Sequence, residues 1–350
     1  MNARKLPSGR WQSKVYIGTV DGKKQFVTVT EDSRKDCLLK AAQVKADIES
    51  DKASPKISVQ EAVERYIDAR RGVLSPSTVA GYVSKLKLYI ASDPIGACRI
   101  DQLTSQKLQK WVSGISAGRS KKTVANTYGL LFSSVRMFRP KADFDVRFPQ
   151  GKRYDGYVPS TEEVFTILEY ARAWDERLYR ACLLSAFGTL RRGEISALTA
   201  NDIHGSFIRV DKDMVKDEHG KWIIKLPKTE DSVRDVQLPS WILETMPKAG
   251  PLVDYRPDEI TKWFCRAVKK AGLPHFRFHD LRKHAVSLMA TQGVSMASIK
   301  EIGGWSNLQT PQQIYIKALS DAHKREMNQY IGHLESLNPQ ESFAKVSPEN

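Results

Sequence analysis

The sequence predicts a multidomain protein with three folded parts. The first is a small N-terminal module of a β-hairpin or small sheet plus a helix, and the second is an all-α helical bundle. The third is a mixed α+β domain, mainly helical, with a small antiparallel sheet. Three observations support this fold class: 350 residues allow two or three cores, the period of the apolar residues changes twice along the chain, and irregular stretches separate the patterns.

The N-terminal module is predicted from alternating side chains. Residues 10–17 and 25–30 alternate between apolar and polar, as half-buried strands do, and Asp21-Gly22 between them is a strong tight-turn signal. Apolar residues at helical spacing then indicate a helix over about residues 34–49. We therefore expect a hairpin that packs against one helix.

The second part has helical periodicity throughout. Between residues 57 and 145, apolar residues recur at three- and four-residue spacing in four successive runs. Ser75-Pro76 begins the second run, Thr104 precedes the third and Ser120 opens the fourth, and these residue types are typical of helix starts. The pattern predicts a bundle of helices.

The third part mixes both periods. Ser160 and Glu163 have capping-box spacing and open a helix, while the helical stretch over residues 183–198 is interrupted at Gly188-Thr189. Alternating runs predict three short strands, at residues 206–210, 222–226 and 233–238. Helical patterns dominate from Pro239 to the end. The resulting boundaries are 1–55, 56–150 and 151–336, followed by a C-terminal tail over 337–350.

The net charge of +15 is concentrated toward the N-terminus. Residues 1–55 hold 11 basic and 7 acidic side chains and residues 56–150 hold 16 and 7, so thirteen of the fifteen excess charges precede residue 151. Clustered basic residues favour contact with the phosphates of nucleic acid, although solvated surface charge is the plainer alternative. Candidate DNA contacts are Arg10, Lys14, Lys85, Lys87, Arg119, Lys121 and Lys122.

Other classes of protein are disfavoured by what the sequence lacks. No run of about 18 apolar residues indicates a membrane span, and the N-terminal residues do not form a secretory signal, so no membrane partner is expected. The four cysteines lie far apart and predict neither a disulfide framework nor a zinc site. These features fit a cytoplasmic protein.

Four motifs in the third part carry candidate chemistry. In order, they are Gly188-Thr189-Leu190-Arg191-Arg192-Gly193-Glu194, then Lys228-Thr229-Glu230-Asp231-Ser232-Val233-Arg234 between the second and third predicted strands, then His279-Asp280-Leu281-Arg282, then Gly303-Gly304-Trp305-Ser306 followed by Tyr315. Each motif alone has an ordinary structural explanation, such as surface charge or packing. Their combination points to one kind of reaction.

That reaction is transfer of a phosphodiester. Two arginines can neutralise the non-bridging oxygens, on which charge grows in the transition state. A tyrosine hydroxyl can attack phosphorus and form a covalent intermediate, a lysine can protonate the leaving sugar oxygen, and a histidine can handle the proton of the nucleophile. The cationic side chains would then do the work of a metal, so no cofactor is expected.

In this order and spacing, the motifs resemble the catalytic signature of the tyrosine recombinases, the phage integrase family. The resemblance implies a catalytic set of Arg191, Lys228, His279, Arg282, Trp305 and Tyr315, with Glu194 as the acidic residue after the first arginine. The helical part resembles the family's core-binding domain and the N-terminal module its arm-site-binding domains. This chain inverts the usual Thr-Gly-Leu at Gly188-Thr189-Leu190, and it places Tyr315 ten positions after Trp305, where nine is usual.

The resemblance implies a site-specific integrase that integrates or excises a mobile element through a 3′-phosphotyrosine intermediate. The implied partners are double-stranded DNA at core and arm sites, further copies of the chain in a tetramer, and DNA-bending and directionality proteins. An amphipathic pattern over residues 320–336 would link subunits or pack on its own domain. A type IB topoisomerase and a non-catalytic DNA-binding regulator of the same fold are the alternatives.

Overall fold

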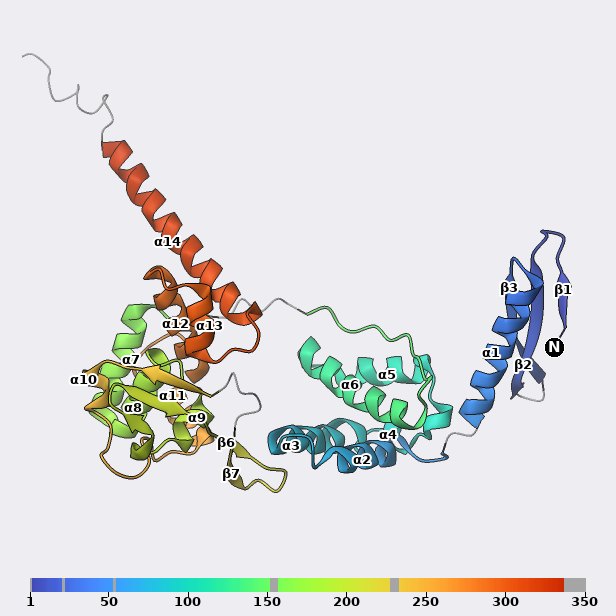
Figure 1. The fold of residues 1–350 in the computed structure, drawn as a ribbon, viewed down its shortest axis with the longest axis horizontal. Helices are drawn as coiled ribbons and strands as arrows, with labels where there is room; N and C mark the ends of the chain where they lie inside the picture. Colours follow the sequence, from blue (N-terminus) through green and yellow to red (C-terminus); the bar gives the residue numbers. More distant parts are fainter. Residues whose placement is uncertain (1, 21–22, 53–54, 152–156, 227–232, 337–350) are drawn as a thin grey trace, which may run out of the picture. The chain divides into compact units, whose positions relative to one another are not determined.

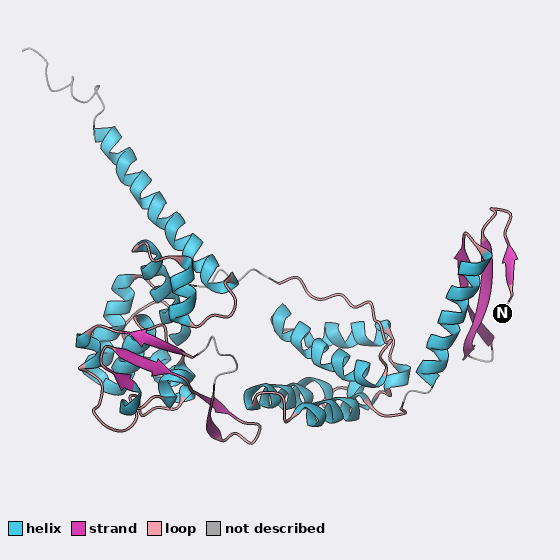
Figure 2. Ribbon diagram, viewed as in Figure 1, coloured by secondary structure: helices cyan, strands magenta, loops and turns pink. Residues whose placement is uncertain are grey.

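The computed structural model describes residues 2–20, 23–52, 55–151, 157–226 and 233–336. The chain divides into two compact units, Met1–Arg153 and Tyr154–Asn350 (Figure 1). In the first unit, buried apolar residues form one core within the N-terminal module and a separate core within the helical bundle. Helices predominate in the bundle and in the second unit, as predicted (Figure 2).

The N-terminal module is an antiparallel sheet that packs against one helix. Its elements are β1 (Ala3–Lys5), β2 (Trp11–Val20), β3 (Lys23–Glu31) and α1 (Arg34–Lys52), with the strands paired in the order β1-β2-β3. Val15 and Val29 of the sheet are buried with Cys37 and Ala41 of α1. The predicted hairpin is confirmed, although its predicted turn at residues 21–22 lies outside the described residues.

Three of the longer helices of the bundle begin at a side-chain cap, and the sequence predicted two of these starts, at Thr104 and Ser120. Its helices are α2 (Val59–Arg70), α3 (Pro76–Lys85), the π-helical turn η1 (Leu86–Ile90), α4 (Pro94–Ala97), the 3₁₀ turn η2 (Ile100–Gln102), α5 (Ser105–Ile115) and α6 (Lys121–Phe138). The side chains of Ser58, Thr104 and Ser120 accept backbone hydrogen bonds from the first turns of α2, α5 and α6.

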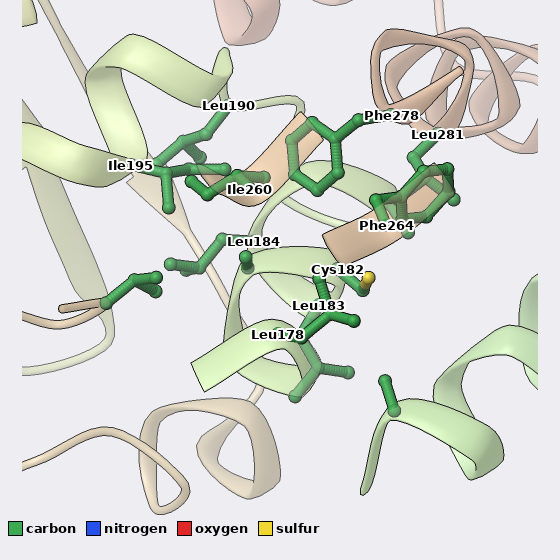
Figure 3. Close-up of a cluster of buried hydrophobic side chains, with 14 of the residues drawn as sticks. Leu178, Cys182, Leu183, Leu184, Leu190, Ile195, Ile260, Phe264, Phe278 and Leu281 are labelled. Atoms are coloured by element: carbon green, nitrogen blue, oxygen red, sulfur yellow. The ribbon is translucent and has the colours of Figure 1, made fainter. Parts of the chain in front are cut away.

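The second unit is built around one helix, α8. Its helices are α7 (Thr161–Trp174), α8 (Glu176–Ala186), α9 (Arg192–Ala197), the 3₁₀ turn η3 (Ala200–Asp202), α10 (Ser240–Leu243), α11 (Pro257–Lys270), α12 (Phe278–Thr291), α13 (Met296–Gly303) and α14 (Gln309–Ser336). Leu183 and Leu184 of α8 are buried with Ile195 of α9, Phe264 of α11 and Leu281 of α12 (Figure 3). This core fixes α12, which carries Arg282, and α9, which begins directly after Arg191.

The strands of the second unit form two sheets rather than the single small sheet that the sequence predicted. One contains β4 (Ile203–His204), β5 (Phe207–Val210) and β8 (Arg234–Gln237), and the other contains β6 (Asp213–Lys216) and β7 (Trp222–Lys225). β7 pairs with β6 and not with β8, so Lys228 lies in sequence between strands of different sheets. The prediction missed β6, a short strand with a charged residue at each end.

The final helix, α14, starts well before the predicted amphipathic segment. It begins at Gln309, whose backbone N–H donates to Asn307 Oδ1 at 2.6 Å, and its first turns pack against α12 and α13. Tyr315 therefore lies on a helix and not in a preceding loop. Within the described part of the chain, no helix is long and apolar enough to cross a membrane.

Candidate active site

Arg191 is positioned by a turn that joins α8 to α9. α8 ends with the backbone N–H of Leu190 donating to Leu184 O at 3.2 Å, and this turn places Thr189 in the left-handed region at φ 58°. A threonine there costs about 1–2 kcal/mol. Gly188 is required for space, since a Cβ would lie 2.8 Å from Leu184 O. The inverted Gly-Thr order thus puts glycine where packing is tight and strain at Thr189.

The guanidinium groups of Arg191 and Arg282 are held by backbone carbonyls. Arg191 donates to Glu194 Oε1 at 2.6 Å and to Gly304 O at 3.0 Å. Arg282 donates to Gly303 O at 2.6 Å and also to Thr189 O. Two of the predicted catalytic residues therefore converge on the C-terminal end of α13, although they lie 91 positions apart in the sequence.

Trp305 lies over the guanidinium of Arg282, with 3.8 Å between the guanidinium carbon and the ring centroid. The ring fits there because Gly303 has no side chain, since a Cβ on that residue would lie 1.6 Å from Trp305 Cζ3. Arg282 is only 1% exposed, whereas the side chain of Arg191 is 36% exposed. In the free chain, Arg191 is therefore the more accessible arginine, and Trp305 covers Arg282.

A third arginine, Arg234 on β8, belongs to the same network and was assigned no role from the sequence. Its Nη atoms donate to both oxygens of Glu194, at 3.2 and 3.0 Å, and its Nε donates to Ile302 O at 2.9 Å. The sequence does contain a signal for this role: Arg234 alternates with Val236 and Leu238, so it is predicted to point to the same buried side of the strand as these apolar residues. We call Arg191, Arg234, Arg282 and Glu194 the arginine cluster.

Positive charge exceeds negative charge in the arginine cluster. Burial alone would raise the pKa of Glu194, but the charges of Arg234 and Arg191 lower that pKa to about 2. Burial and the nearby charge of Arg191 lower the pKa of Arg282 well below its ordinary value. Three guanidinium groups thus lie near one carboxylate, which accepts hydrogen bonds from Arg191 and Arg234, and this excess of positive charge is suited to an anion such as a phosphodiester.

His279 and Arg282 lie one turn apart at the start of α12, as the HxxR spacing predicted. Packing around the imidazole and the charge of Arg282 lower the pKa of His279 to about 4, an effect that solvent moderates on its exposed side. His279 is therefore neutral at pH 7. The other histidine of this helix, His284, is buried, and its Nδ1 lies 3.1 Å from Pro159 O, so its contacts differ from those of His279.

Two residues of the predicted catalytic set are less completely located. Tyr315 is half-buried on α14, and that helix packs against both α12 and α13. Lys228 lies outside the described residues. Two neighbouring lysines are described: Lys225 lies 3.8 Å from Asp213 in an ion pair, and Lys221 is exposed.

The candidate DNA contacts all lie in the first unit. Arg10 is exposed and pairs with Asp32 at 2.8 Å. Lys14, Lys87, Arg119, Lys121 and Lys122 are exposed, and Lys85 is half-buried. Lys85 and Lys122 line one pocket of the bundle together with Tyr89, Ser120 and Asn126. Basic groups thus gather beside the start of α6.

Glu194→Gln should lower the free energy of unfolding at pH 7 by about 3 kcal/mol, because the buried guanidiniums lose their carboxylate. The pKa of Glu194 falls from its ordinary 4.5 to about 2 on folding, so its stabilisation is complete above pH 4.5 and is lost as the pH falls toward 2. Calorimetric unfolding of parent and variant between pH 7 and pH 3 measures the difference. A difference that does not shrink over this interval would contradict the assignment, and Glu176→Gln on the exposed side of α8 is the control.

Comparison with known proteins supports the same interpretation as the geometry. Residues 160–321 match the model of the phage integrase family. A tyrosine recombinase XerC-like protein of Caldanaerobacter subterraneus is 25% identical over 293 residues, which are 69% of this chain and 74% of that protein.

Solved structures show the same fold. The Tn1549 transposon integrase in complex with transposon right end DNA gives a TM-score of 0.66 at 19% identity, over 78% of this chain and 99% of that one. A lambda integrase dimer bound to a COC′ core site gives 0.57 at 17% identity, over 90% and 94%. The segment that holds the arginine cluster is therefore a domain of the phage integrase family, the tyrosine recombinases, which are enzymes that cleave and rejoin DNA.

Proposed function

We propose that this chain is the integrase of a mobile element and that it cleaves DNA through Tyr315. The observation that carries the proposal is the arginine cluster, in which Arg191 and Arg282 converge on the end of α13 with Trp305 beside them. The known structures with this fold include an integrase on transposon DNA and another on a core site, which supports core-site DNA as the substrate.

In the proposed reaction, the Tyr315 oxygen attacks the scissile phosphorus. A tyrosine–phosphorus bond forms, the bond to the 5′ oxygen breaks, and a 3′-phosphotyrosine remains. Arg191 donates to a non-bridging oxygen, and Arg282 does so once the Trp305 ring turns aside. His279, neutral at pH 7, accepts the tyrosine proton, while Lys228 protonates the leaving oxygen. Reversal with a new 5′ hydroxyl rejoins the DNA and needs no ATP, because the phosphotyrosine keeps the bond energy.

The remaining parts of the chain are proposed to bring DNA and subunits together. Residues 56–150, with exposed lysines around the start of α6, would contact core DNA, and residues 1–55 would bind arm sites through the open face of the sheet. Four copies would assemble on paired sites, with DNA-bending and directionality proteins as partners. Because the proposed reaction acts on DNA inside a cell, we propose that the protein is cytoplasmic.

Tyr315→Phe should abolish cleavage and leave affinity for core DNA within about 0.5 kcal/mol of the parent, because the half-buried ring remains. Denaturing gels on a nicked core-site substrate detect the covalent adduct, and a gel-shift titration measures binding. An adduct that survives denaturation in the variant would rule out Tyr315 as the nucleophile. Supercoil relaxation by the parent without paired sites would favour a topoisomerase instead.

Lys228→Ala should slow cleavage of ordinary DNA by about a hundredfold or more, because an alkoxide leaves poorly without a proton. Sulfur at the bridging 5′ position leaves readily, so the variant should recover most of its rate on that substrate. Lys225→Ala is the matched control, since Lys225 is already paired with Asp213. Equal impairment of Lys228→Ala on both substrates would exclude it as the general acid.

The second half of α14 should dock on a neighbouring subunit. Its exposed apolar side chains are Met327, Tyr330, Ile331 and Leu334. Truncation after Ala318, or the gentler Ile331→Asp, should reduce synapsis of two sites more than binding to one site, because buried apolar area is lost only between subunits. Gln329→Asp introduces the same side chain at an exposed neighbouring position and should change neither. Equal loss of synapsis and single-site binding would favour packing of the tail on its own domain.

A further inference from the structure

The C-terminal end of α13 offers consecutive backbone carbonyls to the arginine cluster. A helix leaves its last carbonyl groups without partners inside the helix, and these carry the negative end of its dipole. Here the backbone N–H groups of Trp305 and Gly304 satisfy Lys300 O and Glu301 O. The next three carbonyls, of Ile302, Gly303 and Gly304, accept from Arg234, Arg282 and Arg191 respectively.

Arg234 differs from the other two arginines because it is enclosed. It is 6% exposed on the inward face of β8, opposite Val210 of β5. Its planar group spans both oxygens of Glu194 and the carbonyl of Ile302, so one side chain ties the β4–β5–β8 sheet to α9 and to α13. Arg191 contacts Glu194 of α9 and the residue after α13, Gly304. Arg282 contacts Gly303 of α13 and Thr189 in the turn between α8 and α9.

Through these contacts, Arg234 helps to determine where the guanidinium groups of Arg191 and Arg282 lie. Glu194 accepts from Arg234 and from Arg191, so the place of this carboxylate decides where the Arg191 guanidinium lies. Ile302 O accepts from Arg234 and from the hydroxyl of Thr189, and the next carbonyl along the chain holds Arg282. Loss of the Arg234 fork would free both Glu194 and the end of α13 to move.

We propose that Arg234 is a positioning residue that sets the geometry of Arg191 and Arg282 toward the scissile phosphate, without contacting DNA itself. The inference rests on the proposed role of those two arginines. A lysine at 234 keeps the buried charge but presents a single point donor in place of the planar fork, so it cannot reproduce the three directed bonds. A displacement of about 1 Å in a group that binds the reacting atoms costs about a hundredfold in rate.

The experiment measures single-turnover cleavage of two core-site substrates by the full chain. One carries the natural scissile phosphate, and the other carries a methylphosphonate there, which lacks one anionic oxygen and so needs less neutralisation by guanidinium groups. Arg234→Lys should be about 10- to 100-fold slow on the phosphate and lose about threefold or less on the methylphosphonate. Arg234→Gln is the second variant and carries the test if the lysine variant does not fold, with thermal unfolding and core-site binding as checks of folding.

Arg180→Lys is the matched control. Arg180 Nε donates to a backbone carbonyl, Thr245 O, at 2.6 Å, and its Nη2 pairs with Glu176, so it has the same kinds of partner as Arg234 away from the arginine cluster. It should cleave both substrates at the parental rates. A parental rate for Arg234→Lys on the phosphate, or an equal loss on both substrates, would overturn the proposal.

Arg191→Ala separates this inference from the proposed function. If Arg191→Ala recovers on the methylphosphonate but the Arg234 variants do not, Arg234 has only a structural role and the proposed function stands. If Arg191→Ala is equally slow on both substrates, the arginines do not neutralise the phosphate and the proposed mechanism fails first.

Discussion

The site depends on one constraint: three guanidinium groups must be held close together around a single carboxylate. Like charges at this separation repel, and burial removes the water that would screen them. The structure offsets this with Glu194, whose pKa is lowered to about 2, and with the carbonyls at the negative end of α13. Because the carbonyls of α13 are backbone atoms, any movement of α13 would also move the arginines that donate to them.

The turn between α8 and α9 provides the remaining acceptor and does so in a strained conformation. Thr189 adopts a left-handed backbone, its carbonyl faces Arg282 and its hydroxyl donates to Ile302 O at 3.3 Å. A residue in this region persists only when its surroundings fix it, and strain of this kind is often found at functional sites. Here the hydroxyl contact with α13 and the arginine contact with the carbonyl both hold the turn, so the strain is matched by interactions within the site.

The sequence predicted those parts of the site that local spacing encodes. Arg282 and His279 are one turn apart on α12, and Arg191 and Glu194 have capping-box spacing at the start of α9, so their relations follow from helix geometry. The role of Arg234 and the carbonyls of α13 could not be predicted in this way, because backbone acceptors leave no mark on residue type and the partners lie up to 113 positions apart. β6 was missed because its pairing with β7 outweighs the weak strand preference of its charged ends. The early start of α14 follows from its packing on α12 and α13, which sequence periodicity does not report.

The free chain holds the arginine cluster in a form that is only partly open to a phosphate. The side chain of Arg191 is partly exposed, but Arg282 is buried, with its guanidinium donating to the carbonyls of Thr189 and Gly303 and with the ring of Trp305 packed over it. Its Nε is buried and has no hydrogen-bond partner among the described residues, which costs free energy in this state. A phosphate oxygen that displaces the Trp305 ring would supply an acceptor to Arg282 and recover that cost. Gly304, in the left-handed region at φ 59° directly before Trp305, lies where a small backbone rotation would move the ring. In the proposed mechanism, DNA binding would thereby be coupled to exposure of Arg282 through the same residues that hold the cluster together.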